Sequence, residues 1–243
     1  MNIYQHIIDC AQQGKKLLAI LLDPDKIEVT SIKPLVEKIN KKANFVFVGG
    51  STVQNGVTEK LVDALKEHTQ LPVVLFPGNY TQLSDKADAL LFLSLISGDN
   101  PEYLIHQQVK SIPKLKNMGL EIISTGYILI DGGVETSVQK VSNTKPISQQ
   151  NIELISHTAL AGQYAGKKLI YLEAGSGAKN FVSEKIIKTV KATLDIPLIV
   201  GGGIRSKEQL LNAYKAGADV VVVGTAFEQD VDFLNTLHDE NFS

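Results

Sequence analysis

The sequence predicts an α/β fold, a (β/α)8 barrel, and three observations support this prediction. Short runs rich in β-branched residues recur along the chain and are bounded by Gly and Pro, as buried parallel strands are. The segments between these runs are long enough for about one helix each. The 243 residues fit one barrel of typical size better than two domains, so we expect a single TIM-barrel domain over residues 1–243.

The first half of the chain alternates helix and strand signals. Apolar residues at helical spacing over residues 2–13 predict a helix that caps the bottom of the barrel and ends at Gly14. Five strands are then expected over residues 17–22, 45–48, 72–76, 89–95 and 121–130.

Helical segments are expected over residues 31–41, 57–68 and 149–165, and another runs from Pro101 to about residue 117. Residues 80–87 are short for a full barrel helix, so we expect an irregular third helix. Residues 131–148 are rich in Ser, Thr, Asn and Gly and show no clear period, which predicts a long loop. A loop of that length in a compact domain is usually functional or mobile.

Three apolar runs that end in glycine, residues 169–177, 196–205 and 218–226, complete the barrel. Their glycines lie at the carboxyl ends of the expected strands, where barrels bind their ligands. Glycine lets the backbone approach an anion closely, so that several N–H groups can point at one phosphate. One such glycine is usually an ordinary turn residue, but three consecutive strand ends favour a phosphate-bearing ligand.

Composition excludes several classes of protein. Hydrophobic residues make up 44% of the chain and charged residues 21%, which excludes global disorder. The net charge of −2 gives no reason to expect nucleic acid as a partner. Cys10 is the only cysteine, which favours a reducing compartment, and its amphipathic surroundings favour packing in the core. No run approaches the ~18 apolar residues of a membrane span, so we expect a cytoplasmic protein, with a peripheral membrane contact left open.

Two polar residues at strand ends are candidate metal ligands. Asp23 follows the first strand, next to a proline that fixes the turn. Its carboxylate has three possible tasks: to hold Mg²⁺, to act as a base, or to cap the next helix. Ser51, at the matching end of the second strand, could add a hydroxyl oxygen to a magnesium site, although a serine alone is more often a cap. Magnesium usually needs only one or two protein ligands, with water and phosphate filling the rest.

Glu173 stands within an apolar strand, where a carboxylate must reach the barrel mouth or a buried partner. Strand side chains alternate, so Tyr171 shares its face while Ile170 and Leu172 point the other way. Beside glycines suited to phosphate, Glu173 is expected to bind or deprotonate a substrate hydroxyl. Tyr171 lies one layer deeper and either lines the pocket or fills the core.

Loop cations add little to this picture. Lys26, Lys179 and Arg205 could lend charge to a phosphate, although each is more often a solvated side chain. Most of the affinity for phosphate must therefore come from backbone N–H groups and a metal ion.

Five motifs at the strand ends together resemble those of a known family. They are Leu-Asp-Pro-Asp-Lys (22–26), Val-Gly-Gly-Ser (48–51), Tyr-Leu-Glu-Ala-Gly-Ser-Gly (171–177), Gly-Gly-Gly-Ile-Arg (201–205) and Val-Gly-Thr-Ala (223–226). In this order and spacing the chain resembles the geranylgeranylglyceryl phosphate synthase family, which includes the bacterial heptaprenylglyceryl phosphate synthases. The match extends over nearly the whole chain, and the Tyr-Leu-Glu strand followed by Gly-rich turns is its most specific part.

The resemblance implies that the barrel is a prenyltransferase of ether-lipid biosynthesis. It would join a polyprenyl diphosphate, with geranylgeranyl diphosphate expected, to the free hydroxyl of sn-glycerol 1-phosphate, and release diphosphate. Carried over by position, Asp23 and Ser51 would hold Mg²⁺ on the leaving diphosphate. Glu173 would orient and deprotonate the attacking hydroxyl, with Tyr171 as the second catalytic residue. The residues expected to bind glycerol 1-phosphate are Tyr171, Leu172, Glu173, Ala174, Gly175, Ser176, Gly177, Gly202, Gly203, Gly224 and Thr225.

Two further features bear on the subgroup and on the prenyl substrate. Leu21 stands where many members of the family have a lysine, which indicates the subgroup with the LLDPDK form; a geranylgeranyl chain and a homo-oligomer are usual there. Family members often have an irregular or missing third helix where the prenyl chain lies, consistent with the short segment 80–87. A carbocation-like allylic fragment also needs a dry, apolar channel. The residues expected to line it are Phe47, Phe76, Phe92 and Leu95.

Two other functions stay open on the sequence. A sugar-phosphate isomerase of the histidine-biosynthesis type would use aspartates after the first and fifth strands, for which Asp23 and Asp131 are available. Such barrels usually bind a substrate with two phosphates, and Glu173 would have no task in them. A non-catalytic barrel that binds a phosphometabolite would not need Asp23 and Glu173 to face one pocket.

Overall fold

The computed structural model describes residues 2–224 and 226–227, and within them eight parallel strands close into a barrel. Neighbouring strands pair in sequence order, and the first pairs with the eighth to close the ring. The strands are β1 (Leu17–Leu22), β2 (Phe45–Val48), β3 (Val73–Leu75), β4 (Ala89–Leu95), β5 (Glu121–Leu129), β6 (Leu169–Glu173), β7 (Leu198–Gly201) and β8 (Val220–Val223). The predicted (β/α)8 fold is therefore confirmed. That one domain covers residues 1–243 stays a prediction, because residues 228–243 lie outside the described part.

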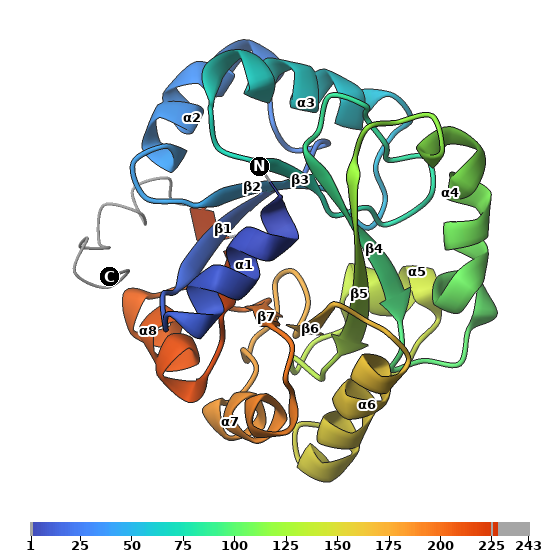
Figure 1. Ribbon diagram of the computed structural model, residues 1–243, viewed down its shortest axis with the longest axis vertical. Coiled ribbons are helices and arrows are strands. Elements are labelled where there is room, and N and C mark those ends of the chain that lie inside the picture. The colour runs from blue at the N-terminus through green and yellow to red at the C-terminus, as the bar shows by residue number, and fades with distance from the viewer. Residues whose placement is uncertain (1, 225, 228–243) are drawn as a thin grey trace.

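The helices surround the barrel, except for the first, which lies across one of its ends (Figure 1). They are α1 (Ile3–Gln12), α2 (Ile32–Ile39), α3 (Val57–His68), α4 (Gln107–Leu115), α5 (Ser137–Ser142), α6 (Ile152–Tyr164), α7 (Glu184–Thr193) and α8 (Lys207–Ala216). A 3₁₀ turn (Val29–Ser31) precedes α2, and a π-helical turn (Glu102–His106) precedes α4. In the described part of the chain, no helix combines the length and apolar character that crossing a membrane requires.

One expectation about the helices is wrong. The segment 131–148 was expected to be a long loop, and it contains the short helix α5. The Thr136 side chain caps this helix by accepting a hydrogen bond from the backbone N–H of Gln139. Six residues are too few for a helical period to stand out in the sequence.

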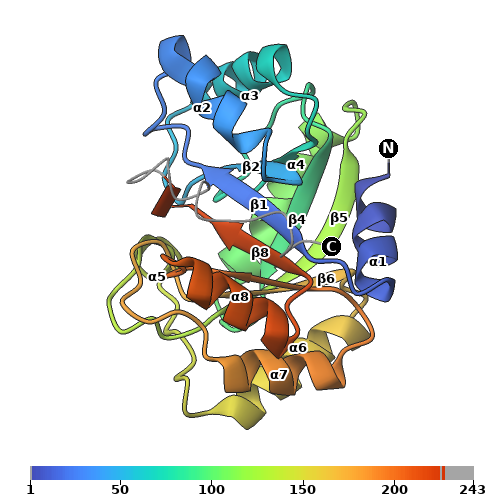
Figure 2. The same ribbon diagram turned by 90° about the vertical axis from the view of Figure 1, so that its left-hand side faces the viewer.

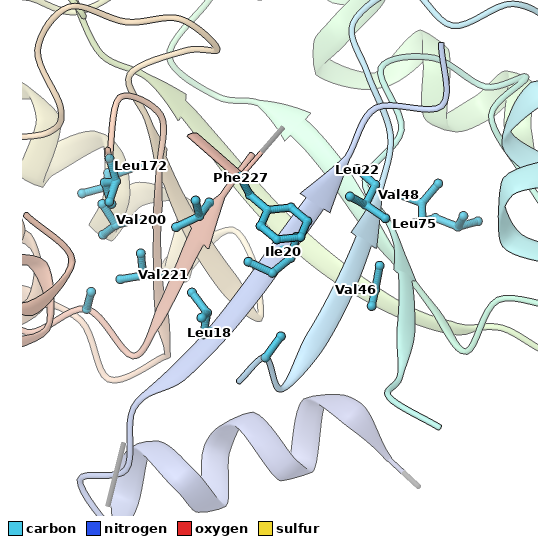
Figure 3. Packing of buried hydrophobic residues seen from close by; sticks show 14 of the residues in the cluster. Leu18, Ile20, Leu22, Val46, Val48, Leu75, Leu172, Val200, Val221 and Phe227 are labelled. Atoms are coloured by element: carbon cyan, nitrogen blue, oxygen red, sulfur yellow. The ribbon is translucent and has the colours of Figure 1, made fainter. Parts of the chain in front are cut away.

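Alternate side chains of each strand point to opposite faces of the barrel wall. The outward set packs beneath the helices and includes Leu18 and Ile20 of β1, which Figure 3 shows among their neighbours. The inward set fills the barrel and includes Tyr171, which is fully buried. Leu172 belongs to the outward set, so the predicted alternation along β6 is confirmed.

Helix α1 closes the end of the barrel at which the strands begin (Figure 2). Ile3, Ile7 and Cys10 pack into the inward cluster, so the predicted capping helix and the predicted core position of the cysteine are both confirmed. The Glu121 carboxylate at the start of β5 accepts hydrogen bonds from the N–H groups of Ile3 (2.6 Å) and Tyr4 (2.9 Å). A carboxylate at a helix N-terminus satisfies N–H groups that have no partner within the helix.

The helix that would connect β3 to β4 in a regular barrel is missing. Residues 76–88, all described, connect β3 to β4 through turns alone. The sequence predicted that the helix after the third strand is irregular, and this is confirmed in the stronger form that segment 80–87 contains no helix. As a consequence, Leu90 and Phe92 on the outer face of β4 border a cavity instead of a helix.

Candidate active site

A cavity of about 420 Å³ opens at the carboxyl ends of the strands. Loops from both sides of the barrel contribute to it, including those that follow β1, β2, β3, β6 and β7. Both Asp23 and Glu173 line this one cavity. The two carboxylates that the sequence marks as candidates therefore share a single site.

Glu173 is the last residue of β6 and is only 5% exposed. Its Oε1 atom accepts a hydrogen bond of 2.6 Å from the backbone N–H of Gly175. Burial raises the pKa of Glu173 to about 7, against the lowering effects of the Gly175 N–H and, more weakly, of the Tyr171 hydroxyl. A carboxyl group with this pKa exchanges a proton readily near neutral pH, which suits a general base.

The glycines at the end of β7 and directly after it allow the chain to pass directly over Glu173. A Cβ atom on Gly201 would lie 2.2 Å from the Tyr171 hydroxyl oxygen, and one on Gly202 would lie 2.3 Å from Glu173 Oε1. Gly202 also has a φ of +81°, which side-chain-bearing residues rarely adopt. The glycine run is therefore needed here for close approach to the two candidate catalytic side chains.

Tyr171 belongs to an aromatic cluster at the base of the cavity. Its ring stacks on Phe76 at a centroid distance of 5.1 Å and lies 5.5 Å from Tyr127, its partner in strand register. Burial raises the pKa of both tyrosines well above the usual value, and the nearby Glu173 adds to this effect. Although it is close enough to Glu173 to lower that residue's pKa, the Tyr171 hydroxyl makes no hydrogen bond of good geometry to any described residue. It thus retains its capacity to bond a ligand. Tyr127, which the sequence reasoning missed, sits on the same inward face.

The loop after β6 turns beside the cavity through two glycines with positive φ, Gly175 (+97°) and Gly177 (+75°). Arg205, from the loop after β7, donates hydrogen bonds to the carbonyls of Gly177 (3.1 Å) and Ala178 (2.9 Å). Arg205 also lines the cavity, so it fastens this loop and brings a positive charge to the rim.

Not all residues expected to bind glycerol phosphate reach the cavity. The side chains of Leu172 and Ala174 lie in the outward cluster, and the Ala174 N–H donates to the carbonyl of Gly201 (3.1 Å). The Gly175 N–H is engaged by Glu173. Thr225 lies outside the described residues. Those of the expected set that line the cavity are Tyr171, Glu173, Ser176, Gly177, Gly202, Gly203 and Gly224.

Asp23 and Ser51, the expected metal ligands, line the opposite side of the cavity. Asp23 Oδ1 accepts a 3.2 Å hydrogen bond from the Asp25 N–H, and Lys26 Nζ lies 3.4 Å from Oδ2. Gly50 packs so closely that a Cβ atom there would lie 2.7 Å from Asp23 Oδ1. The described residues contain no group of three or more His, Cys, Asp or Glu side chains arranged to hold a metal ion. One carboxylate and one hydroxyl fit Mg²⁺, which takes most of its oxygen ligands from water and phosphate.

The remaining part of the cavity is apolar and runs toward the gap left by the missing helix. Of the four residues expected to line a prenyl channel, Phe76, Phe92 and Leu95 line this cavity. Phe47 does not, because it lies inside the barrel behind Phe76, at a ring-centroid distance of 6.4 Å. Further apolar lining comes from Leu83, Leu90, Leu91, Leu93 and Tyr103.

Two glutamines that the sequence reasoning missed join the loops around the cavity. Gln82 bonds the backbone of the loops after β2 and β3, and Gln149 bonds the backbone of the loops after β5 and β6. Neither stands in a motif, and apart from Gly78 their partners lie 18 or more residues away, so no local signal could have found them.

The geometry disfavours the isomerase alternative. That alternative needs Asp23 and Asp131 to act on one substrate, but Asp131 does not line the cavity. Its carboxylate instead accepts a 2.8 Å hydrogen bond from the Gly133 N–H within its own loop.

Comparisons with known proteins show which family the chain belongs to. The chain is 57% identical, over 93% of its length and 97% of the relative's, to a protein of Zunongwangia profunda named geranylgeranylglyceryl phosphate synthase. A Pyrococcus abyssi protein of the same name is 40% identical over 93% of this chain and 90% of its own. The crystal structure of (S)-3-O-geranylgeranylglyceryl phosphate synthase from Thermoplasma acidophilum, in complex with substrate sn-glycerol-1-phosphate, superposes with a TM-score of 0.92 at 34% identity, covering 100% of this chain and 98% of that one. The model of the PcrB family matches residues 12–240, and the chain therefore belongs to the PcrB family.

Proposed function

We propose that this chain transfers a geranylgeranyl group from its diphosphate to the free hydroxyl of sn-glycerol 1-phosphate, the reaction for which its relatives are named. The observation that carries the proposal is one cavity with a polar half and an apolar half, lined by both Asp23 and Glu173. A prenyltransferase needs both halves, because it brings a phosphorylated polyol and a long hydrocarbon chain to one reaction centre.

In this proposal, glycerol phosphate lies against the glycine turns after β6, β7 and β8. Their lining residues are Ser176, Gly177, Gly202, Gly203 and Gly224, and Arg205 supplies a cation beside them. Backbone at glycine can approach a phosphate closely, which suits a half of the cavity with few basic side chains.

Glu173 acts as the general base on the attacking hydroxyl, which Tyr171 helps to orient. The glycerol oxygen forms a bond to the first carbon of the prenyl group, and the bond from that carbon to diphosphate breaks. The hydroxyl proton passes to the Glu173 carboxylate, whose pKa of about 7 matches the task.

Asp23 and Ser51 are the residues that would hold Mg²⁺ at the diphosphate. When bound there, Mg²⁺ would stabilise the negative charge that develops on the leaving diphosphate. The Lys26 ammonium group lies 3.4 Å from Asp23 Oδ2 and places a positive charge on the diphosphate side of the cavity. Leu21 contributes an apolar side chain to the same cavity. This arrangement is consistent with assignment to the LLDPDK subgroup, which we also propose.

We further propose a homo-oligomer in the cytoplasm, with peripheral contact to membranes during substrate uptake. Its support is an exposed apolar stripe on and before α4, where Ile105 is 52%, Val109 61% and Ile112 48% exposed. These residues lie on one face of the helix, since they are spaced by four and three positions. Native mass spectrometry tests the oligomer, and vesicle flotation tests the membrane contact.

Mass spectrometry of reaction products tests the main proposal. Purified protein is incubated with sn-glycerol 1-phosphate, Mg²⁺ and prenyl diphosphates of increasing chain length. We expect geranylgeranylglyceryl phosphate as the main product. Absence of any ether product with every prenyl diphosphate would refute the proposed function.

A further inference from the structure

Gln82 lies in the helix-free segment between β3 and β4 and is 2% exposed. Its Oε1 atom accepts hydrogen bonds from the N–H groups of Gly50 (3.4 Å) and Gly78 (3.2 Å). Its Nε2 atom donates a 2.9 Å hydrogen bond to the carbonyl of Gly50. One side-chain amide thus holds both backbone groups of Gly50 and joins the loop after β2 to the loop after β3.

The two loops are in close contact at this point. A Cβ atom on Gly78 would lie 2.4 Å from the Gly50 carbonyl oxygen and 3.0 Å from Ser51 Cα. Gly50 in turn packs against Asp23, since a Cβ atom on Gly50 would lie 2.7 Å from Asp23 Oδ1. A displacement of Gly50 would therefore change the spacing between Asp23 and Ser51, because Ser51 is the next residue in the chain.

We propose that Gln82 is a positioning residue for the half of the site that binds metal and diphosphate. It keeps Gly50 seated against Asp23 and so sets the distance between the Asp23 carboxylate and the Ser51 hydroxyl. This inference rests on the proposed function, in which those two groups hold Mg²⁺.

The chemistry of the amide explains why glutamine is needed. Gly50 presents a donor and an acceptor, and only a side chain that both accepts and donates satisfies the two together. A leucine of similar size would leave the partly buried backbone groups of Gly50 and Gly78 without these partners. A glutamate keeps the acceptor but loses the donor, so it should retain part of the positioning of Gly50.

The test compares Gln82→Leu and Gln82→Glu with Gln163→Leu. Gln163 has the same kind of paired bonding, to Asp195 (Nε2 to Oδ2, 3.0 Å; Asp195 N–H to Oε1, 2.9 Å), but it does not line or border the cavity. Turnover is measured against Mg²⁺ and against glycerol 1-phosphate, and Mn²⁺ binding is followed by electron paramagnetic resonance with inorganic pyrophosphate present.

For Gln82→Leu we expect the Mg²⁺ concentration at half-maximal turnover to rise roughly tenfold and the Mn²⁺ affinity to fall by a similar factor, with the KM for glycerol 1-phosphate changed by less than about twofold. Gln82→Glu should fall between this variant and the wild type, and excess Mg²⁺ should restore turnover. Gln163→Leu should leave all these constants unchanged.

A purely structural role predicts a different pattern. The inference is overturned if Gln82→Leu and Gln82→Glu lower turnover only in proportion to the folded fraction seen by circular dichroism, or if metal affinity and glycerol phosphate KM change equally. Should Gln82→Leu not fold, Gln82→Glu carries the same comparison. A wild-type chain that forms no ether product refutes the proposed function instead, so the two failures are distinguishable.

Discussion

The two halves of the cavity are built by different means. The half after β6, β7 and β8 consists of short regular strands, each followed by glycine turns, around the buried Glu173. The half beside β3 and β4 exists because a helix is missing, and its loops are set by Gln82. A phosphate site can be built from backbone conformation alone, whereas a channel for a hydrocarbon chain needs space that a regular barrel would fill.

Each half nevertheless has a glutamine that joins one of its loops to a neighbouring loop. Gln149 Nε2 donates to the carbonyls of Asp131 (2.9 Å) and Phe181 (3.1 Å), and its Oε1 accepts from the Ser183 N–H (3.0 Å). It thereby ties the loop after β5 to the segment that follows the glycine turn of β6. The comparison predicts that the two halves can be impaired separately, and the following changes test this from the largest expected effect to the smallest.

Glu173→Gln should have the largest effect on catalysis. Glutamine keeps the acceptor for the Gly175 N–H but cannot take a proton, so we expect kcat to fall by about 10²–10⁴-fold with the fold retained. Product formation by mass spectrometry and circular dichroism measure the two quantities. Activity within about twofold of the wild type would remove the general-base role.

The same carboxyl group should make activity and stability depend on pH in opposite directions. The pKa of Glu173 is about 7 in the folded chain, whereas it has its ordinary value of 4.5 in the unfolded chain. Between these values only the unfolded chain releases the proton, so the free energy of unfolding falls as the pH rises and is constant above about 7. The base is active only when deprotonated, so kcat rises over the upper part of this range.

Glu173→Gln should therefore be more stable than the wild type at pH 8, by about 3 kcal/mol, and equally stable near pH 4. Urea unfolding at both pH values measures the difference. An equal difference at pH 4 and pH 8 would show that packing, and not the ionised carboxylate, is responsible. The expected result is a direct case of stability given up at a functional site.

Asp23→Asn should impair the other half of the cavity. Asparagine keeps the acceptor for the Asp25 N–H but lacks the charge that favours Mg²⁺, so the Mg²⁺ requirement should rise by at least the roughly ten- to hundredfold typical of lost outer-shell partners. The KM for glycerol 1-phosphate should change little. Unchanged dependence on Mg²⁺ would contradict a metal-binding role for Asp23.

How much of this could be read from the sequence depends on how local the signal is. Glu173 stands out because a charged residue interrupts an apolar strand, and Gly202 because glycine runs mark turns with positive φ. The motif assigned Leu172 and Ala174 to the ligand as well, yet side-chain alternation turns Leu172 outward. Gln82 gave no signal, since its partner Gly50 lies 32 residues away in a different loop.

The absent helix was visible only as a shortage of residues between two strands. That shortage predicted irregularity, and Phe92 was expected to line an apolar channel, but nothing in the sequence indicated that Leu90 would line a cavity on the outer face of β4. Phe47 was misplaced for the related reason that hydrophobicity alone does not distinguish a channel wall from the interior packing behind it. Local patterns thus identify the chemistry, whereas long-range contacts decide the shape of the site.

Gln149→Leu should have the smallest effect and sharpens the comparison most. It removes three hydrogen bonds to backbone groups of loops on the glycerol phosphate side, and each bond is worth about 1 kcal/mol at most where solvent can replace it. We expect the KM for glycerol 1-phosphate to rise by about fivefold while the Mg²⁺ dependence stays within about twofold of the wild type. Gln82→Leu should show the reverse pattern. Steady-state kinetics should therefore show that each of the two variants changes one constant and leaves the other nearly unchanged. If both variants instead shift the same constants, the loops move as one body, and the division of the cavity into two independently positioned halves is wrong.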